Sequence, residues 1–337
     1  MKKLKIALLL LIILVGGVIG YAASPAVFLN AASTHKIVHF PKGDEVNPLA
    51  APNFLKVLTY NVGYASGEKN NLPVKLSEEE VRANLDRIAE EIKKLHPDVI
   101  CLQEVDFDSN RTHHINQFEY LAKALNMPYG AYVITWNKRY LPWPYWPPSI
   151  HYGKMLSGQA ILSRYPIEHD LVLDFSKPSE NPFWYNWFYL DRVAQKVTLR
   201  VGYKGVNVWN VHLEAFHPKT RQNQAELLAE WVALESNPYK IVMGDFNSVS
   251  HKKANLSSED KKELEDNGEA IQKFVTITGL KNAEANSEFF TMPSWNPVKK
   301  IDHILYKPDV WVELASGNVE KVTASDHLPV WSILKMQ

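Results

Sequence analysis

The chain has 337 residues, of which 46% are hydrophobic and 22% charged, a composition that excludes a disordered or fibrous protein. Lysine plus arginine and aspartate plus glutamate both number 37, so the formal net charge is zero and the basic excess typical of proteins that hold long nucleic acids is missing. Cys101 is the single cysteine, which excludes an intrachain disulfide and a cysteine metal cluster. Its apolar neighbours predict a small buried side chain.

An apolar segment lies near the amino terminus. Lys2, Lys3 and Lys5 precede the uncharged residues 6–23, which predicts either a signal peptide or an uncleaved signal anchor within residues 1–24. With the help of residues 24–29, the segment is just long enough to cross a bilayer, which takes about 20 residues. We expect the anchor, because Pro25 is unfavourable just after the small-residue cleavage position. In both cases the rest of the chain lies outside the cytoplasm, either tethered to the cell membrane or secreted.

The remaining chain divides into a linker and one domain. Residues 25–52 are rich in proline and alanine without sustained periodicity and are expected to form a linker. Residues 53–337 are expected to form a single α/β domain. Its first helix follows a capping box of Ser77 and Glu80, and Pro97 ends it. In chain order we expect strands at 54–60, 99–102, 159–163, 193–201, 206–212, 240–243, 301–306, 310–314 and 329–334, and further helices at 116–125, 220–234 and 258–278.

Polar residues of one chemical kind lie at the ends of five of the expected strands. They are Asn61; Glu104; Asn210 with His212; Asp245 with Asn247; and Asp302 with His303, followed by Ser325, Asp326 and His327. Strand ends of one sheet can converge on a single face, so these side chains are expected to lie together. Carboxylates, carboxamides and imidazoles are the groups that metal-assisted phosphoester hydrolysis requires.

Seven motifs in this order resemble the endonuclease/exonuclease/phosphatase superfamily, which includes deoxyribonuclease I, apurinic endonucleases, inositol-phosphate phosphatases and neutral sphingomyelinases. The motifs are residues 58–62, 102–105, 157–164, 210–213, 244–247, 301–304 and 325–329. The resemblance spans the whole of 53–337. It implies a four-layer α/β/β/α sandwich, in which two packed mixed sheets are flanked by helices and the site lies at one end of the sheets. It also implies a divalent metal, Mg²⁺, with Mn²⁺ as the alternative.

The chemistry of the side chains, supported by the family pattern, suggests their roles. Glu104 and Asn61 are predicted to hold the metal, and Asp326 to contact it directly or through water, because a hard cation prefers oxygen ligands. One metal or two are compatible with the sequence.

The catalytic groups are predicted in the same way. His327 is expected to activate or orient the attacking water, and Asp302 to fix its tautomer and stabilise the imidazolium. Asp245 is expected to orient the nucleophile. Asn247 and His212 are expected to donate hydrogen bonds to the oxygens that gain charge in the transition state.

Substrate contacts are predicted for Arg192, Asn210, Tyr152, Trp143 and Trp146. Arg192 is expected either to clamp a phosphate or to form a surface ion pair with Asp191. The aromatic stretches 136–152 and 183–189 flank the strand at 159–163 and are expected to line the rim of the site. Tryptophan and tyrosine favour the interface of a bilayer, although these side chains could also stack on nucleobases or pack under long loops.

The leading hypothesis is a monomeric, membrane-tethered, magnesium-dependent phosphodiesterase or phosphatase that acts on phospholipid or sphingolipid headgroups, similar to the neutral sphingomyelinases. An extracytoplasmic nuclease is the first alternative. A catalytically inactive module that binds the cell envelope is the second, and the intact motif set argues against it.

Overall fold

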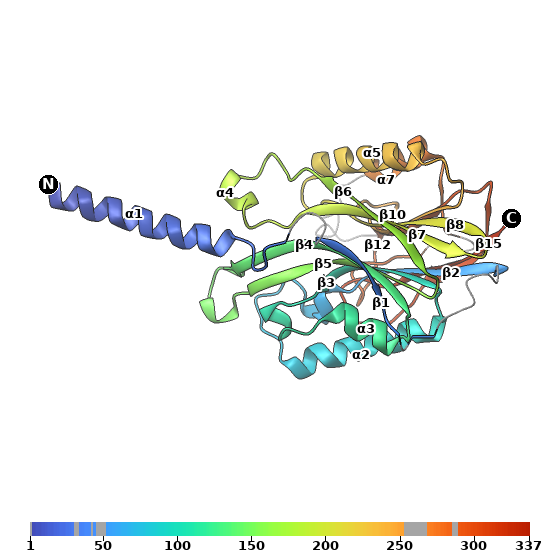
Figure 1. Cartoon of the computed structure of the whole chain (residues 1–337), viewed down its shortest axis with the longest axis horizontal. Helices are drawn as coiled ribbons and strands as arrows, with labels where there is room; N and C mark the ends of the chain where they lie inside the picture. The colour runs from blue at the N-terminus through green and yellow to red at the C-terminus, as the bar shows by residue number, and fades with distance from the viewer. Residues whose placement is uncertain (1, 30–33, 42, 45–51, 253–267, 285–288) are drawn as a thin grey trace.

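Two β-sheets packed face to face form the centre of the structure, a computed structural model that describes residues 2–29, 34–41, 43–44, 52–252, 268–284 and 289–337 (Figure 1). The first sheet has the strand order β1 (His35–His39), β4 (Tyr129–Leu141), β5 (Gly153–Ser163), β3 (Val99–Asp106), β2 (Phe54–Asn61), β15 (Val330–Met336) and β14 (Trp311–Asn318). The second has the order β11 (Lys281–Asn282), β13 (Asp302–Tyr306), β9 (Lys240–Asp245), β8 (Lys204–His212), β7 (Arg192–Val201) and β6 (Ile167–Phe175). Two short strands, β10 (His251–Lys252) and β12 (Lys299–Lys300), pair with each other and form a separate two-stranded sheet.

Helices cover the outer face of each sheet (Figure 1). α2 (Glu78–Leu95) and α3 (Gln117–Ala124) pack on the first sheet, and α5 (Pro218–Leu234) and α7 (Glu269–Thr278) pack on the second. The predicted capping box of Ser77 and Glu80 begins α2. A single turn, α4 (Phe183–Asn186), lies in the segment before β7. The four-layer α/β/β/α sandwich predicted from the sequence is therefore confirmed.

Side chains that alternate between the two faces of the central strands pack into three large hydrophobic cores, one between the sheets and one beneath the helices on each side. In β3, Val99 and Cys101 lie in the core between the sheets, whereas Ile100 and Leu102 pack beneath α2 and α3. Successive side chains of a strand point to opposite faces, so a strand buried on both sides is apolar throughout. The buried position predicted for Cys101 is confirmed.

The structure differs from the expected elements at several places. Residues 35–39, inside the predicted linker, form β1 and pair with β4, so part of that segment belongs to the first sheet. β4 and β6 were not expected, and the predicted aromatic loop from Trp136 begins inside β4. The predicted helix at 258–278 is observed as Glu269–Thr278, while residues 258–267 lie outside the described residues.

α1 (Lys2–Ala23) extends away from the sandwich and joins it at β4 (Figure 1). By length and composition the helix could cross a membrane, and Ala22 is its buried residue. The backbone N–H of Arg139 donates to the Ser24 carbonyl at 2.9 Å, and Asn137 both donates to and accepts from the backbone of Val27. The helix end is thus attached directly to a strand of the first sheet.

Candidate active site

Strand ends from both sheets meet at one edge of the sandwich. In the parallel pairs, Asn61 at the end of β2 lies opposite Gln103 of β3, and His212 at the end of β8 lies opposite Asp245 of β9. β13 runs antiparallel to β9 and places Asp302 opposite Asp245. The structure therefore brings together the polar residues that the sequence places after separate strands.

Close backbone packing precedes Asp245. Gly244 has a φ of +146°, and a Cβ atom there would lie 2.0 Å from the carbonyl oxygen of Val211. Glycine is therefore required at this position of β9, because the neighbouring strand β8 leaves no room for a side chain.

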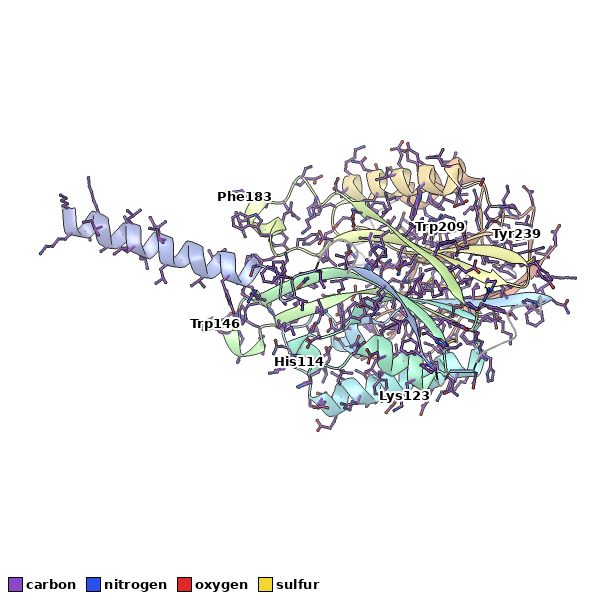
Figure 2. All side chains as sticks on the ribbon, viewed as in Figure 1. His114, Lys123, Trp146, Phe183, Trp209 and Tyr239 are labelled. Atoms are coloured by element: carbon purple, nitrogen blue, oxygen red, sulfur yellow. The ribbon has the colours of Figure 1, made fainter. Side chains whose placement is uncertain are left out.

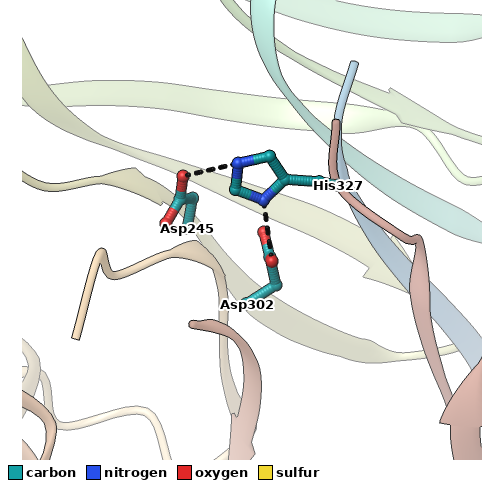
Figure 3. A group of neighbouring side chains, drawn as sticks. All are labelled: Asp245, Asp302 and His327. Atoms are coloured by element: carbon teal, nitrogen blue, oxygen red, sulfur yellow. Dashed lines mark hydrogen bonds and ion pairs between the residues drawn. The ribbon is translucent and has the colours of Figure 1, made fainter. Parts of the chain in front are cut away.

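His327 lies between two buried aspartates (Figure 3). Its Nδ1 lies 2.9 Å from Asp302 Oδ2, and because a carboxylate only accepts, Nδ1–H donates. Nε2 then faces Asp245 Oδ2 at 3.8 Å. Burial lowers the pKa of His327, but the charges of Asp302 and Asp245 outweigh it and raise that pKa well above its usual value. The surroundings of His327 thus stabilise an imidazolium, which is the form produced when the ring takes a proton from water.

Asp245 is the point at which several side chains converge. Its Oδ2 accepts from Asn61 Nδ2 at 3.0 Å and lies 3.6 Å from His212 Nε2, while its Oδ1 accepts from the backbone N–H of Asn247 at 2.8 Å. Burial and the charge of Asp302 raise the pKa of Asp245 to about 7. Burial, together with the charges of Arg192 and His327, lowers the pKa of His212 well below 6.5, so this ring is neutral at neutral pH.

A β-bulge directs Glu104 into the site. The pairing of β3 with β5 shifts register between Leu102 and Val105, and Glu104 has a positive φ of 54°. Bulges re-aim a side chain at the cost of local ladder pairing. The carboxylate of Glu104 accepts from Asn70 Nδ2 at 3.1 Å, and the same Nδ2 lies 3.2 Å from both oxygens of Asp326.

The carboxylates of Glu104 and Asp326 fit a divalent cation. Burial, and next the charge of Asp326, raise the pKa of Glu104, while the charges of His327 and Arg192 lower it; the two acids repel each other and both accept from the neutral amide of Asn70. Asp245, Asp302 and His327 also offer ligand atoms within 4.8 Å of one another. There, however, Nδ1–H of His327 already donates to Asp302 Oδ2, so that nitrogen is not free to bind a metal. A hard cation with oxygen ligands is therefore better matched to Glu104 and Asp326.

Asn61 and Asn247 are both engaged within the site. Asn61 Oδ1 accepts from the backbone N–H of Gly63 at 3.0 Å while its amide holds Asp245, so a carbonyl lone pair is left for a metal. Asn247 Nδ2 donates to the Leu213 carbonyl at 3.0 Å and keeps a second N–H.

Arg192 occupies the wall of the site, away from its predicted ion-pair partner. Asp191 instead lies 3.1 Å from Lys177 Nζ. The Arg192 guanidinium is buried, its Nε lies 3.9 Å from Glu214 Oε2, and its Nε and Nη1 have no hydrogen-bond partner among the described residues. Glu214 Oε1 accepts from Tyr189 Oη at 2.7 Å. A buried cation with unused donors beside Glu104 and His212 is suited to hold a phosphate oxygen.

The predicted substrate contact of Asn210 is wrong. Its Nδ2 donates to the carbonyls of Leu102 and Ala160, and its Oδ1 accepts from Gln103 Nε2 at 2.7 Å, so the fully buried side chain clips the two sheets together. Asn210 and His212 share one face of β8, but Asn210 lies two residues deeper. At this depth its side chain contacts backbone carbonyls beside the β3 bulge and does not reach the open edge of the sheet.

The three aromatic residues predicted to bind substrate lie outside the catalytic cluster. Tyr152 is buried in a small group with Leu141 and Met155, and its ring lies 4.8 Å from the guanidinium carbon of Arg111. Trp143 and Trp146 lie in the segment after β4. Their contact with substrate stays a prediction.

Two residues that contact the site were missed by the sequence analysis. Asn70 lies in a loop without any periodic signal, so nothing in the sequence indicated it. Glu214 could have been found, since it stands two residues after His212 and strand alternation carries it to the same side.

His303, next to Asp302, predicts how stability depends on pH. Its Nε2–H donates to the Ser248 carbonyl, Nδ1 accepts from Asn282, and burial, with Lys300, lowers its pKa from 6.5 to about 3. Between these values the unfolded chain binds more protons than the folded one, so stability falls as pH drops through this window, by about 1.4 kcal/mol per pH unit.

This dependence can be measured by urea unfolding of the chain in detergent at about pH 7 and about pH 5. The wild type is expected to lose roughly 2 kcal/mol more than His303→Gln, whose amide keeps both hydrogen bonds without titrating. Equal losses in the two proteins would contradict a neutral, buried His303.

The chain is similar to known proteins in sequence and in fold. The model of the family described as "Endonuclease/Exonuclease/phosphatase family" matches residues 58–327. The uncharacterized protein YbhP of Escherichia coli strain K12 is 27% identical over 179 residues, which cover 50% of this chain and 60% of that relative. The chain thus spans less than two thirds of the length of this curated relative.

Solved structures share the fold at low identity. An endonuclease/exonuclease/phosphatase from Beutenbergia cavernae DSM 12333 has a TM-score of 0.61 at 20% identity, covering 85% of this chain and 72% of that one. The catalytic domain of human Nocturnin with a bound sulfate anion has a TM-score of 0.57 at 17% identity, covering 90% and 98%.

Proposed function

The chain belongs to the endonuclease/exonuclease/phosphatase family of phosphoester hydrolases, and we propose that it hydrolyses phosphoesters of lipid headgroups at a membrane surface outside the cytoplasm. Divalent metals are general in this family, and buried acidic and histidine side chains suited to them are present. Mg²⁺, or Mn²⁺ in its place, is part of the proposal.

The site geometry supports attack by water on phosphorus. His327 accepts a proton from the water at Nε2, and Asp302 stabilises the resulting imidazolium through Nδ1–H. Asp245, whose Oδ2 faces His327 and His212, orients the water. As the new P–O bond forms, the bond to the leaving alcohol breaks, and the alcohol oxygen takes up a proton from solvent water, while His327 returns its own proton to solvent.

Two sets of groups would stabilise the negative charge on the phosphoryl oxygens. The neutral His212, the free N–H of Asn247 and the guanidinium of Arg192 donate to its non-bridging oxygens. Glu104 and Asp326, with Asn61 beside them, would hold a divalent cation, which supplies charge neutralisation at the phosphoryl and leaving oxygens.

The position of α1 is the single observation that carries the lipid assignment. β3 ends at the site, and its Asp106 pairs with Ser157 of β5, while Leu141 at the end of β4 pairs with Gly153. The carboxyl end of β4 is therefore at the site end of the first sheet. Since α1 is attached there through residues 137 and 139, a membrane crossed by α1 would lie next to the catalytic residues.

The test uses the full chain, because a domain cut at residue 53 would lose strand β1. The protein would be incubated with vesicles of mixed phospholipid and sphingomyelin, and in parallel with plasmid and single-stranded DNA, with Mg²⁺ or with EDTA. We expect headgroup release that requires Mg²⁺ and is lost in His327→Ala. DNA cleavage without headgroup release would replace the proposal with an anchored nuclease, and inactivity on every substrate would favour the non-catalytic binding module.

A further inference from the structure

Two segments beside the site carry large exposed aromatic side chains. We call this group the aromatic crest, and it consists of Trp143, Tyr145, Trp146, Phe183, Trp184 and Trp187. Trp146 is 78% exposed and Phe183 is 70% exposed. Large exposed aromatic side chains that cluster in this way are uncommon on soluble proteins and mark a surface that contacts a partner or a membrane.

The aromatic crest lies at the end of the sandwich from which α1 extends. In the view of Figure 2, Phe183 lies above the domain end of α1 and Trp146 lies below it. The first segment continues β4 directly. The second is held to β4 by hydrogen bonds from Trp136 Nε1 to the Phe188 carbonyl at 2.7 Å and from the Asp191 N–H to the Thr135 carbonyl at 2.8 Å.

The attachment of α1 leaves little freedom between helix and domain. The helix ends at Ala23, and the next carbonyl, that of Ser24, already accepts from β4. Arg139 also makes cation–π contacts, because its guanidinium carbon lies 5.2 Å from the ring centre of Tyr21 and 5.4 Å from that of Phe28. A helix of 22 residues is about 33 Å long, enough for the roughly 30 Å hydrocarbon core of a bilayer.

The chemistry of the aromatic crest matches the membrane surface that this attachment implies. Tryptophan and tyrosine concentrate at the level of lipid headgroups, because their rings are apolar and carry one polar hydrogen. A nucleic acid would instead be expected to meet basic side chains presented between the rings, whereas Lys177, beside the second segment, is engaged by the carbonyls of Asn186 and Tyr189. The occupant indicated by the position of the aromatic crest is therefore a bilayer.

We propose that the aromatic crest inserts into the interface of the bilayer that α1 crosses and holds the mouth of the active site on the headgroup layer. The proposal rests on the membrane location in the proposed function and adds a second, non-covalent contact to it. It does not depend on catalysis, so it can fail or hold independently of the reaction.

Tryptophan fluorescence can test this contact because α1 contains no tryptophan. The full-length His327→Ala protein would be reconstituted into phosphatidylcholine vesicles, with or without bromine on the acyl chains near the headgroup. Bromine quenches nearby indoles, so we expect quenching in the brominated vesicles. Most of it should be lost when Trp143, Trp146, Trp184 and Trp187 are all changed to Phe, which keeps the apolar rings.

A matched reporter tests whether quenching is confined to the proposed face. Tyr203 lies 90% exposed in the turn after Val201, where β7 pairs with β8 at the end away from His212. In the four-fold Phe variant, Tyr203→Trp should add fluorescence that bromine does not quench. Quenching of this reporter would overturn the proposal, and so would crest tryptophans that stay unquenched in the parent protein. In the second case the surface would be free to contact a second copy of the chain or a soluble partner. Failure to release headgroups would refute the proposed function and leave this result unchanged.

Discussion

Replacing His327 by alanine is expected to lower kcat by about 10²–10⁴-fold, the range for loss of a positioned general base. The imidazole receives the proton of the attacking water at Nε2, and Asp302 holds the opposite nitrogen at 2.9 Å. The substitution removes the proton acceptor and leaves the carboxylates of Glu104 and Asp326 in place. KM is therefore expected to change much less than kcat.

The measurement is a steady-state assay on a chromogenic phosphoester with Mg²⁺, using the full chain in detergent. His169→Ala is the matched control, because His169 is an exposed histidine in β6 and should keep full activity. Asp302→Asn is expected to lose activity as well, since an amide cannot stabilise the imidazolium. If His327→Ala kept more than about a tenth of the wild-type kcat, His327 would not be the base.

Changing Glu104 to glutamine is expected to raise the Mg²⁺ concentration needed for half-maximal activity by at least about 10²-fold. The carboxylate supplies negative charge for the cation, and the isosteric amide lacks this charge. EDTA should abolish wild-type activity because it removes the cation itself. Glu90→Gln, at an exposed position of α2, is the control and should leave the metal requirement unchanged.

The same substitution has a second expected effect that does not involve catalysis. Without metal, Glu104 and Asp326 repel each other in a buried site, so Glu104→Gln should raise the melting temperature of the metal-free protein. Added Mg²⁺ should stabilise the wild type and have little effect on the variant. Equal stabilisation of both proteins by Mg²⁺ would place the cation elsewhere.

The convergence of the catalytic residues follows from the sequence for a physical reason. Asp245 and Asn247 come after a short apolar run, and His212 comes after a strand with alternating faces, so each must emerge at the edge of a sheet. The same holds for Asn61 and Glu104. These strand ends predicted that the polar residues lie together, whereas the four-layer fold and the place of the site were implied by the resemblance of the ordered motifs to the family.

The sequence pattern could not predict how deeply a side chain lies between the sheets or which residues far apart in the sequence are in contact. Asn210 shares a face with His212, yet its position between the sheets depends on the bulge beside Glu104, which a one-sequence pattern does not reveal. Asn70 contacts Glu104 and Asp326 across 34 and 256 residues of sequence. β1 is five residues long and gains its structure from pairing with β4, so its own sequence resembles a linker.

The most direct test of the account is to follow lipid hydrolysis by the full chain in water enriched in heavy oxygen. If water activated by His327 attacks phosphorus, mass spectrometry of the phosphorus-containing product released from the vesicles should show one heavy oxygen per molecule. That product should not form with EDTA or with His327→Ala. Label in the alcohol product, or no release from lipid under conditions in which the chromogenic ester is cleaved, would contradict the account.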